Sequence, residues 1–519
     1  MLCRLWRGSG QIAGPPHRCI TTFRDLGVPE RVTTTLKTHF RVQTPTEGQE
    51  ALLPALFTGR DVLFRDYTGT GKSVALCAYI ASRYDRRKRV AVDNQPPSTQ
   101  VSSLVLSPTR ELAVQLHGWI VSLLRPHHPS DTDIQCILNG LDRNEQASRL
   151  QTHTPSIIVG TPLRVRELVH DKVIDLGALE VLVLDEVDYL IREASPKASV
   201  TEKFRNVIHP RPGEMLVDQI VSQRRDMAEG DVSRVKRKSK NSKKPTAAPA
   251  EDTVAKADHT DNCGRTLQII ASSATLPAYL HHSLVWKRKW LQNPLLLDMT
   301  TSESVAPQNI THHVLVIRED GTSHDVFSNE KDSLPPDPIT EMALADADEL
   351  VLEAVASMII RDNIKSALLF VASSVALDPI IEKFQEQGIP AQKLIRQIDW
   401  NAFGTQVKYS DRDAGDGANT VTSYPEPPAT PFESFTSGKT KLLICTEHAA
   451  RGLDLPNTTH VFILGPPSTP QSYLHMAGRA GRFGRRGTVI NVLSGSRHVE
   501  NVTKMLSSLF LKTGVYVNA

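Results

Sequence analysis

The chain has 519 residues, of which 40% are hydrophobic and 23% are charged, and its formal net charge is +3. This length predicts two or more domains with ordinary cores, and so small a net charge gives no indication of a nucleic-acid partner by itself. No apolar run reaches the roughly 18 residues that a membrane span needs. The six cysteines form no CxxC pair, which argues against a zinc site and against a disulfide framework.

The amino-terminal segment is basic. Residues 1–24 contain four arginines, with leucine, tryptophan and isoleucine among them, and the first acidic residue is Asp25. A basic, acid-poor and weakly amphipathic start without a secretory apolar region is typical of a mitochondrial presequence. We therefore expect a presequence over residues 1–22 and a protein of the mitochondrial matrix. The alternative is a disordered amino-terminal tail.

Short apolar runs, bounded by polar residues, glycine or proline, recur between helical stretches. Runs of this length predict parallel strands that are covered on both faces. The pattern stops and restarts, which predicts an α/β fold of two domains, residues 23–300 and 301–519. The predicted strands are 62–64, 104–106, 157–159, 181–184 and 269–271 in the first domain, and 367–371, 442–445, 461–464 and 489–492 in the second.

Two segments depart from this pattern. Residues from about 195 to 265 are polar, and seven of the eleven residues 234–244 are basic. We expect a disordered insertion here, at least from about residue 225 to 262. It is either a basic arm that binds phosphate backbones or a solvated linker without a partner. Residues 398–433, rich in Gly, Asp, Thr and Pro, predict a surface insertion in the second domain.

The run Thr68-Gly69-Thr70-Gly71-Lys72-Ser73 follows the predicted strand 62–64 and precedes an apolar helix. This is the context of a phosphate-binding loop, in which backbone amides and a helix N-terminus surround the phosphates. Lys72 is expected to reach the β- and γ-phosphates of ATP, and Ser73 to bind Mg²⁺. The first position of the pattern is Asp66; a carboxylate there weakens nucleotide binding unless it points away.

A second pair of polar residues ends the strand 181–184. Asp185 and Glu186 stand at its carboxyl end, where parallel sheets place their ligands. An aspartate there holds Mg²⁺ through water, and a neighbouring glutamate takes the proton of the attacking water. Such a pair is common without a function, but the phosphate loop about 110 residues upstream favours the catalytic interpretation.

Seven motifs in this order resemble the DEAD-box RNA helicases over about residues 23–495. Leu163, Val187, Glu447 and Met476 depart from the family pattern, where glycine, alanine, aspartate and arginine are usual. The motifs are Pro108-Thr109-Arg110-Glu111-Leu112-Ala113, Gly160-Thr161-Pro162-Leu163-Arg164, Asp185-Glu186-Val187-Asp188, Ser273-Ala274-Thr275, Leu369-Phe370-Val371, Thr446 to Asp454, and His475-Met476-Ala477-Gly478-Arg479-Ala480-Gly481-Arg482.

The resemblance implies two tandem RecA-like domains and an RNA-dependent ATPase that uses ATP and Mg²⁺. Asp454 would contact the ribose, and Arg479 and Arg482 would reach the γ-phosphate when the cleft between the domains closes. The glycine-rich run around them would otherwise be only a basic turn. Four residues would couple the ATP site to closure: Asp188, Ser273, Thr275 and His475.

The adenine-contacting element has two alignments. The family carries an upstream aromatic residue, matched by Phe23, and a glutamine, matched by Gln49 through its spacing to Pro54. Glu47 occupies that position in the alternative alignment. A glutamine can both donate to and accept from the edge of adenine, whereas an ionised glutamate can only accept. Selectivity for adenine therefore depends on which residue is the counterpart.

The resemblance also implies RNA binding through the backbone, with little readout of sequence. The positions carried over are Thr109, Arg110, Thr161, Arg164 and Thr446, and Arg110 could equally be a structural ion-pair partner. We expect a monomer without a membrane partner that acts on structured or ribosomal RNA. The long basic insertion resembles fungal mitochondrial members that assemble the large ribosomal subunit, which makes mitochondrial ribosome assembly intermediates candidate partners.

Two other functions compete with an RNA helicase. The first is an RNA-binding scaffold that has lost ATP turnover, which Asp66, Glu447 and Met476 motivate. The second is a DNA-directed helicase, against which the match over residues 108–113 argues. Lys72 and Glu186 are both retained and argue against the scaffold.

Overall fold

A computed structural model describes most of residues 21–516, and the predicted presequence lies almost wholly outside it. The basic run 234–244, most of the second insertion, Thr68, Asp454 and Arg482 also lie outside the described residues. The segments left out are 1–20, 68, 95–99, 125–132, 195, 197, 226–266, 301–308, 319, 329–347, 373, 395–430, 448–454, 456–457, 482–484, 496–497 and 517–519.

The first domain is built on a parallel sheet in the order β3-β4-β2-β5-β6-β1-β7. Neighbouring strands that are far apart in sequence, such as β1 and β6, require crossovers, and helices supply them. The strands are β1 (Val62–Arg65), β2 (Ser103–Leu106), β3 (Ile134–Ile137), β4 (Ile157–Gly160), β5 (Val181–Leu184), β6 (Gln268–Ser273) and β7 (Leu295–Asp298).

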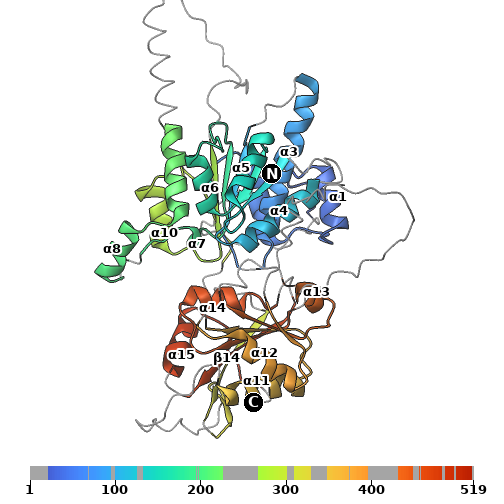
Figure 1. The fold of residues 1–519 in the computed structure, drawn as a ribbon, viewed down its shortest axis with the longest axis vertical. Helices are drawn as coiled ribbons and strands as arrows, with labels where there is room; N and C mark the ends of the chain where they lie inside the picture. Colours follow the sequence, from blue (N-terminus) through green and yellow to red (C-terminus); the bar gives the residue numbers. More distant parts are fainter. Residues whose placement is uncertain are drawn as a thin grey trace, which may run out of the picture.

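The helices of the first domain lie on both faces of this sheet (Figure 1). A further helical segment covers residues 212–225. The named helices are α1 (Glu30–Thr38), α2 (Glu47–Phe57), α3 (Lys72–Asn94), α4 (Arg110–Leu124), α5 (Arg143–Thr152), α6 (Pro162–His170), α7 (Val187–Leu190), α8 (Val200–Ile208), α10 (Ala278–His282) and a π-helical turn, η2 (Ser283–Lys287).

The second domain repeats this architecture in the order β11-β12-β10-β13-β14-β8-β9, and only the β8–β9 pair is antiparallel. Figure 1 shows it below the first domain, with α14 on the side that faces α7. Its elements are β8 (Ile310–Ile317), β9 (Ser323–Asp325), α11 (Glu349–Arg361), β10 (Ala367–Val371), α12 (Leu377–Glu386), β11 (Ala391–Lys393), α13 (Pro431–Thr436), β12 (Leu442–Thr446), β13 (His460–Leu464), α14 (Pro470–Ala477), β14 (Gly487–Ser494) and α15 (Val499–Ser508).

Each sheet separates two hydrophobic cores. Successive residues of a strand point to opposite faces: Val181 and Val183 of β5 enter one core, and Leu182 and Leu184 enter the other. This explains why the sequence shows continuous apolar runs rather than alternation. The nine strands predicted from such runs are confirmed, and no helix of the described chain is long and apolar enough to cross a membrane.

The prediction missed β3, β7, β8, β9 and β11, which lie at or near the sheet edges. In β3 the middle residues Gln135 and Cys136 are only partly buried, so the apolar run is broken. In β8, His312 and His313 interrupt it. Both are nevertheless buried, because His312 Nδ1 lies 2.7 Å from the Tyr473 hydroxyl and His313 Nδ1 lies 2.7 Å from the Gly514 carbonyl oxygen.

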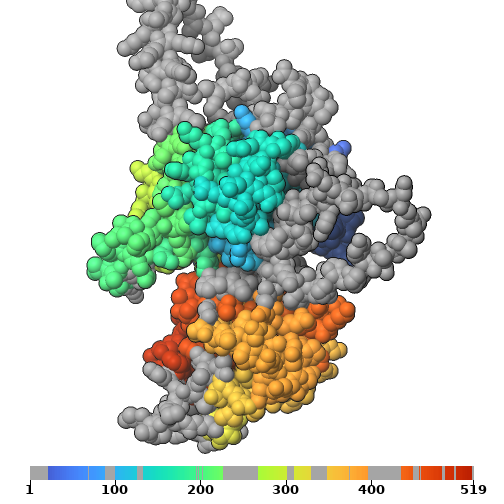
Figure 2. Space-filling view, viewed as in Figure 1, coloured from blue at the N-terminus to red at the C-terminus, as the bar shows by residue number. Residues whose placement is uncertain are grey.

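The first part of the polar segment that starts at about residue 195 contains helices. Residues 212–225 are helical and bury Leu216, Val217 and Ile220 in the first domain's core. Glu214 anchors this segment by accepting from the Arg192 amide at 2.6 Å and from Arg288 at 2.7 Å. The polar composition concealed three apolar residues at helical spacing. In contrast α8 is exposed, and Figure 2 shows it projecting from the side of the domain.

Asp61 offers a test of this packing. Its buried carboxylate accepts from the Ile269 amide at 2.7 Å and from the Gln292 amide at 2.6 Å, which joins β6 to the segment before β7. Burial raises the pKa of Asp61 above its usual value, although the two hydrogen bonds act to lower it. Asp61→Asn must turn an NH₂ group toward one amide donor, so we expect a loss of about 1–3 kcal/mol in the free energy of unfolding, measured by urea denaturation.

The control is Asp320→Asn, because Asp320 is exposed and accepts from the Thr322 amide at 2.9 Å in a turn. Its effect should stay below about 0.5 kcal/mol. Equal losses for the two variants would contradict the assignment.

Candidate nucleotide and RNA site

The predicted motifs of the first domain meet at one edge of its sheet, at the carboxyl ends of the strands. The phosphate loop follows β1, Asp185 follows β5, and Ser273 ends β6. These three strands are neighbours in the sheet. The motifs carried over as RNA contacts follow β2 and β4, which lie on the other side of β5 together with β3. After the predictions for their residues, we call the part of this edge at β1, β5 and β6 the nucleotide half and the part at β2 and β4 the RNA half.

The phosphate loop has the conformation that its glycines permit. Gly69 and Gly71 have φ values of +80° and +89°, a region that other residues rarely adopt. The loop is held from below by α2: the Thr46 hydroxyl donates to the Thr70 carbonyl at 2.8 Å, and Gln49 Nε2 donates to the Gly71 carbonyl at 3.1 Å. A Cβ at position 71 would lie 2.4 Å from Gln49 Nε2, so this glycine is also required by space.

Lys72 is folded onto the loop. Its ammonium donates to the Asp66 carbonyl at 2.8 Å and to the Tyr67 carbonyl. Burial lowers the pKa of Lys72, and the carboxylates of Asp66 and Asp185 oppose this. Lys72 is therefore within electrostatic reach of the acidic groups at the ends of β1 and β5, and a bound phosphate would replace the carbonyls as its partner.

Asp185 joins three elements through one carboxylate. Oδ2 accepts from the Ser73 hydroxyl of α3 at 2.9 Å, and Oδ1 accepts from the Ser272 hydroxyl of β6 at 2.5 Å. The residue is 1% exposed. Burial raises its pKa, and the charge of Glu186 raises it further, while the two serines and Lys72 lower it. The predicted magnesium ligands Ser73 and Asp185 are thus in direct contact.

Glu186 has an unusual backbone and a free carboxylate oxygen. Its φ of 52° and ψ of 55° lie in the left-handed region, which costs a non-glycine residue about 1–3 kcal/mol and is concentrated at functional sites. Its Oε2 is buried without a hydrogen-bond partner. A buried acceptor of this kind is suited to a ligand proton that the rest of the protein does not supply.

The oxygen donors of Ser73 and Asp185 fit Mg²⁺, which prefers one or two carboxylates together with phosphate and water. The unpartnered Oε2 of Glu186 adds negative potential beside them. The described residues contain no group of three or more His, Cys, Asp or Glu that could hold a metal ion.

Asp188 connects the two domains. Its Oδ2 accepts from the Thr275 hydroxyl and lies 3.6 Å from His475 Nε2 of α14. The Tyr189 ring packs edge-on against His475 at 4.9 Å. Burial alone would raise the pKa of Asp188, but His475 and the Thr275 and Ser273 hydroxyls outweigh it and hold the pKa below its usual value. The Ser273 hydroxyl also donates to the Thr275 carbonyl at 2.6 Å.

The predicted arginines of the second domain are placed only in part, because Arg482 and Asp454 lie outside the described residues. Arg479 is 2% exposed, and its Nε donates to the His475 carbonyl at 3.0 Å. Met476, which replaces an arginine of the family pattern, is buried in the second domain's core. The motif therefore presents His475 to the first domain and keeps Met476 inside its own.

The adenine-contacting candidates lie in different surroundings. Gln49 is 3% exposed. Its Oε1 accepts from the Thr46 amide at 3.0 Å, and its Nε2 donates to the Gly71 carbonyl. Both ends of the side-chain amide are therefore bonded to the protein itself. Glu47, the alternative, is exposed at the start of α2. Phe23 is fully buried in the first core, so in this structure its ring has no face open to a base.

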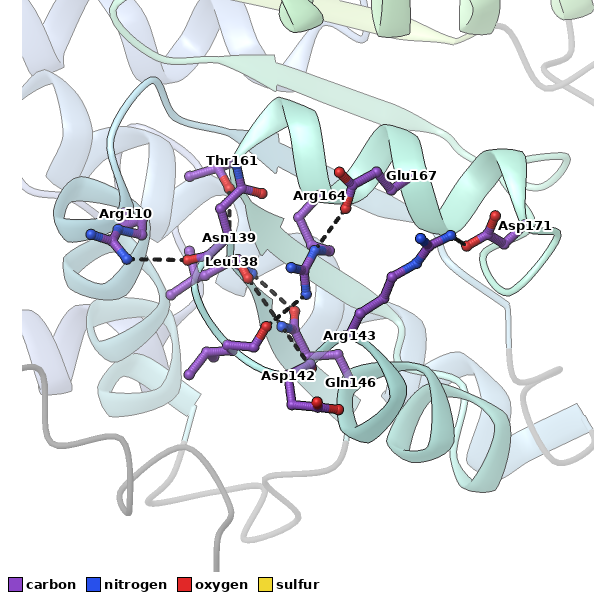
Figure 3. A network of polar contacts seen from close by, with 11 residues as sticks. Arg110, Leu138, Asn139, Asp142, Arg143, Gln146, Thr161, Arg164, Glu167 and Asp171 are labelled. Atoms are coloured by element: carbon purple, nitrogen blue, oxygen red, sulfur yellow. Dashed lines mark hydrogen bonds and ion pairs between the residues drawn. The ribbon is translucent and has the colours of Figure 1, made fainter.

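The RNA half is a network of polar contacts around the loop after β3 (Figure 3). Arg110, at the start of α4, donates to the Asn139 carbonyl at 3.3 Å, and the Thr161 hydroxyl accepts from the Asn139 amide at 3.4 Å. Arg110 is exposed, and both interpretations of its role, RNA contact and structural partner, stay open. Thr109 precedes α4, and its hydroxyl accepts from the Leu112 amide at 3.2 Å.

Arg164 has a different environment from Arg110. Its guanidinium donates to the Leu141 carbonyl at 3.0 Å and to Glu167 at 2.9 Å, and its side chain is 11% exposed. It holds the loop after β3 rather than facing solvent. In the second domain, Thr446 ends β12 and is partly buried, and the next residue, Glu447, accepts from the Ser468 hydroxyl at 2.9 Å and from Ser472 of α14.

The sequence prediction missed Asn139 and Gly140, which lie between the two RNA motifs. Gly140 has a φ of +86°, and a Cβ there would lie 2.3 Å from Arg110 Nη1. Gln146 closes the loop from beneath by accepting from the Leu138 amide at 3.1 Å and donating to its carbonyl at 3.0 Å. A glycine just after a strand is the signal for such a loop, but it was not apparent because β3 itself was missed.

Known proteins share this architecture. A family model described as DEAD/DEAH box helicase matches residues 46–282, and one described as helicase conserved C-terminal domain matches residues 429–484. The ATP-dependent RNA helicase DBP7 of Candida albicans is 26% identical over 495 residues, which are 91% of this chain and 59% of that protein. The chain thus spans less than two thirds of that relative's length.

Two further proteins are similar along nearly the whole chain. The DEAD-box ATP-dependent RNA helicase 47, mitochondrial, of Arabidopsis thaliana is 24% identical over 498 residues, covering 94% of this chain and 76% of that protein. The structure of S. cerevisiae Dbp5 bound to RNA and ADP BeF3 has a TM-score of 0.58 at 18% identity and covers 95% of this chain and 94% of that one. With its motifs on two RecA-like domains, the chain belongs to the DEAD-box ATP-dependent RNA helicase family.

Proposed function

We propose that this protein hydrolyses ATP in response to RNA and uses the closure of its two domains to separate short RNA duplexes or remodel RNA–protein complexes. The observation that carries the proposal is the contact of Asp188 with His475 across the two domains, 3.6 Å apart. Asp188 also binds Thr275, which follows β6. Residues that line the nucleotide half of the first domain are thus joined directly to the arginine-bearing motif of the second.

The residues of the site divide the work of hydrolysis. Lys72 leaves the loop carbonyls for the β- and γ-phosphates of ATP, and Glu186 Oε2 accepts the proton of the attacking water. Mg²⁺, held by Ser73 and Asp185, would neutralise charge on the phosphates. Arg479 and Arg482 donate to the γ-phosphate once the domains close, so turnover depends on RNA that binds both domains. Gln49 fixes the loop, and Asp454 binds the ribose.

RNA is the substrate that the polar residues around the loop after β3 support. Thr109, Arg110 and Thr161 surround one loop at the RNA half of the sheet edge. Hydroxyls, one guanidinium and backbone amides suit phosphates and 2′-hydroxyls, and they read little sequence. The acid-poor residues 1–24, and the similarity to a relative named mitochondrial, support action in the mitochondrial matrix, on structured or ribosomal RNA and ribosome assembly intermediates.

An ATPase-impaired RNA-binding scaffold is the second candidate. It is favoured by one observation, the charged Asp66 beneath the phosphate loop, which is 3% exposed. It is disfavoured by the contact of Ser73 with Asp185 and by the unpartnered carboxylate oxygen of Glu186, since both are arranged for hydrolysis. Turnover measurements separate the two functions.

Glu186→Gln tests the proposed base. The amide cannot accept the proton, so RNA-stimulated ATP turnover should fall by at least about a hundredfold. A matched control is Glu500→Gln, because Glu500 is exposed on α15, where it pairs with Lys504. Steady-state phosphate release with and without single-stranded RNA measures both. Wild-type protein that binds RNA but shows no turnover would instead support the scaffold.

Gln49→Ala and Glu47→Ala separate the two alignments of the adenine-contacting element. Removal of the Gln49 amide takes one of two donors from the Gly71 carbonyl, which keeps the Ala75 amide at 3.1 Å, and takes the acceptor from the Thr46 amide. The loop is then held less firmly, so we expect the Kd for ATP to rise about tenfold. Glu47→Ala should leave it unchanged because its side chain is exposed. Calorimetric titration with ATP and with GTP gives both affinities and their ratio. A larger effect from Glu47→Ala would reverse the assignment.

His475→Ala tests the coupling between the domains. Without the imidazole, Asp188 loses its partner in the second domain, so the ratio of ATP turnover with RNA to turnover without RNA should fall about tenfold. His498→Ala is the control, because His498 precedes α15 without a side-chain capping bond. An unchanged ratio in His475→Ala would remove this contact from the mechanism.

A further inference from the structure

Asp66 and Gly48 form a matched pair beneath the phosphate loop. The Asp66 side chain is 3% exposed, and its Oδ1 accepts from the Tyr67 amide at 2.7 Å. Its other oxygen, Oδ2, points at α2, where a Cβ on Gly48 would lie only 2.2 Å away. The carboxylate therefore occupies the space that the missing side chain of Gly48 leaves, and it does not point into solvent.

Gly48 has no backbone reason to be a glycine. It lies in the first turn of α2, and it is absent from the residues with positive φ. Glycine in a helix costs up to about 1 kcal/mol relative to alanine. The space required by the Asp66 carboxylate is thus the physical reason for glycine at this position.

Four groups face the Asp66 carboxylate. Lys72 on the same loop attracts it, the Thr70 hydroxyl and the Tyr67 amide bind it, and Asp298 at the end of β7 repels it. Asp298 is itself paired with Arg65 at 3.2 Å. Burial raises the pKa of Asp66 and Asp298 adds to this, while Lys72, Thr70 and Tyr67 act in the opposite direction.

We propose that Asp66 sets the affinity of the phosphate loop for nucleotide in a proton-dependent way. When Asp66 is ionised, its charge keeps Lys72 on the loop and repels the phosphates of the nucleotide. When Asp66 is protonated, Lys72 is free to move to the phosphates and the repulsion is absent. The inference rests on the proposed function in one respect, that a nucleotide binds at this loop. Binding of nucleotide is then linked to the uptake of a proton, and affinity falls as the pH rises through the titration of Asp66.

The test compares full-length wild type with Asp66→Asn, using MgADP as the probe. Calorimetric titrations between about pH 6 and about pH 8, in buffers of different ionisation enthalpy, give the Kd and the protons taken up. Protons that MgADP itself takes up or releases contribute equally to the measurements on both proteins, so they cancel in the comparison. At about pH 8 the variant should bind about tenfold more tightly, because one unit charge near the phosphates is removed. It should also take up fewer protons than wild type.

A double-mutant cycle supplies a second readout, which holds even if Asp66→Asn fails to fold. Gly48→Ala should lower the thermal midpoint of the wild type, because its Cβ displaces the carboxylate. In the Asp66→Gly background the same change should raise the midpoint, because alanine is the better helix former. The same effect in both backgrounds would overturn the pairing.

Two further outcomes distinguish a failure of this inference from a failure of the proposed function. Equal Kd values and equal proton uptake in wild type and Asp66→Asn would overturn the inference and leave the proposed function intact. Failure of both proteins to bind MgADP at about pH 6, where protonation of a carboxyl with a raised pKa is greatest, would overturn both.

Discussion

The structure of the nucleotide half depends on one buried charge, the carboxylate of Asp185. A buried ionised carboxylate is costly unless its oxygens are hydrogen-bonded, and here Ser73 and Ser272 satisfy one oxygen each. Those two bonds hold the first turn of α3 and the end of β6 against the end of β5. The phosphate loop, which leads into α3, is therefore positioned by the same group that is assigned to the metal.

The order of the strands brings the nucleotide half and the RNA half into direct contact. The RNA half ends on β2 and the nucleotide half begins on β5, and these strands are hydrogen-bonded neighbours with Leu106 opposite Leu184. The Asp185 amide donates to the Leu106 carbonyl at 3.1 Å. One backbone hydrogen bond therefore joins β2, which leads to α4, to Asp185, and Asp188 in turn lies 3.6 Å from His475.

Prediction from sequence succeeded where burial on two faces leaves a continuous apolar run, as in β5, and where a motif has a required backbone, as in the phosphate loop. It failed where a strand at a sheet edge tolerates polar residues, as in β3, and where histidines are buried with partners from distant segments, as in β8. The contact between Asp66 and Gly48 could not be predicted from the sequence for the same reason. It joins positions 18 residues apart that only the fold brings together.

The burial of Phe23 limits how much of the amino terminus a protease can remove. Its ring is fully enclosed in the first core, and just before it the Thr22 hydroxyl donates to Asp25 at 2.7 Å. Cleavage before Thr22 would leave this turn intact, whereas cleavage after Phe23 would open a large apolar cavity beside α1 and α2. Any amino-terminal truncation that removes Phe23 would therefore damage the core of the first domain.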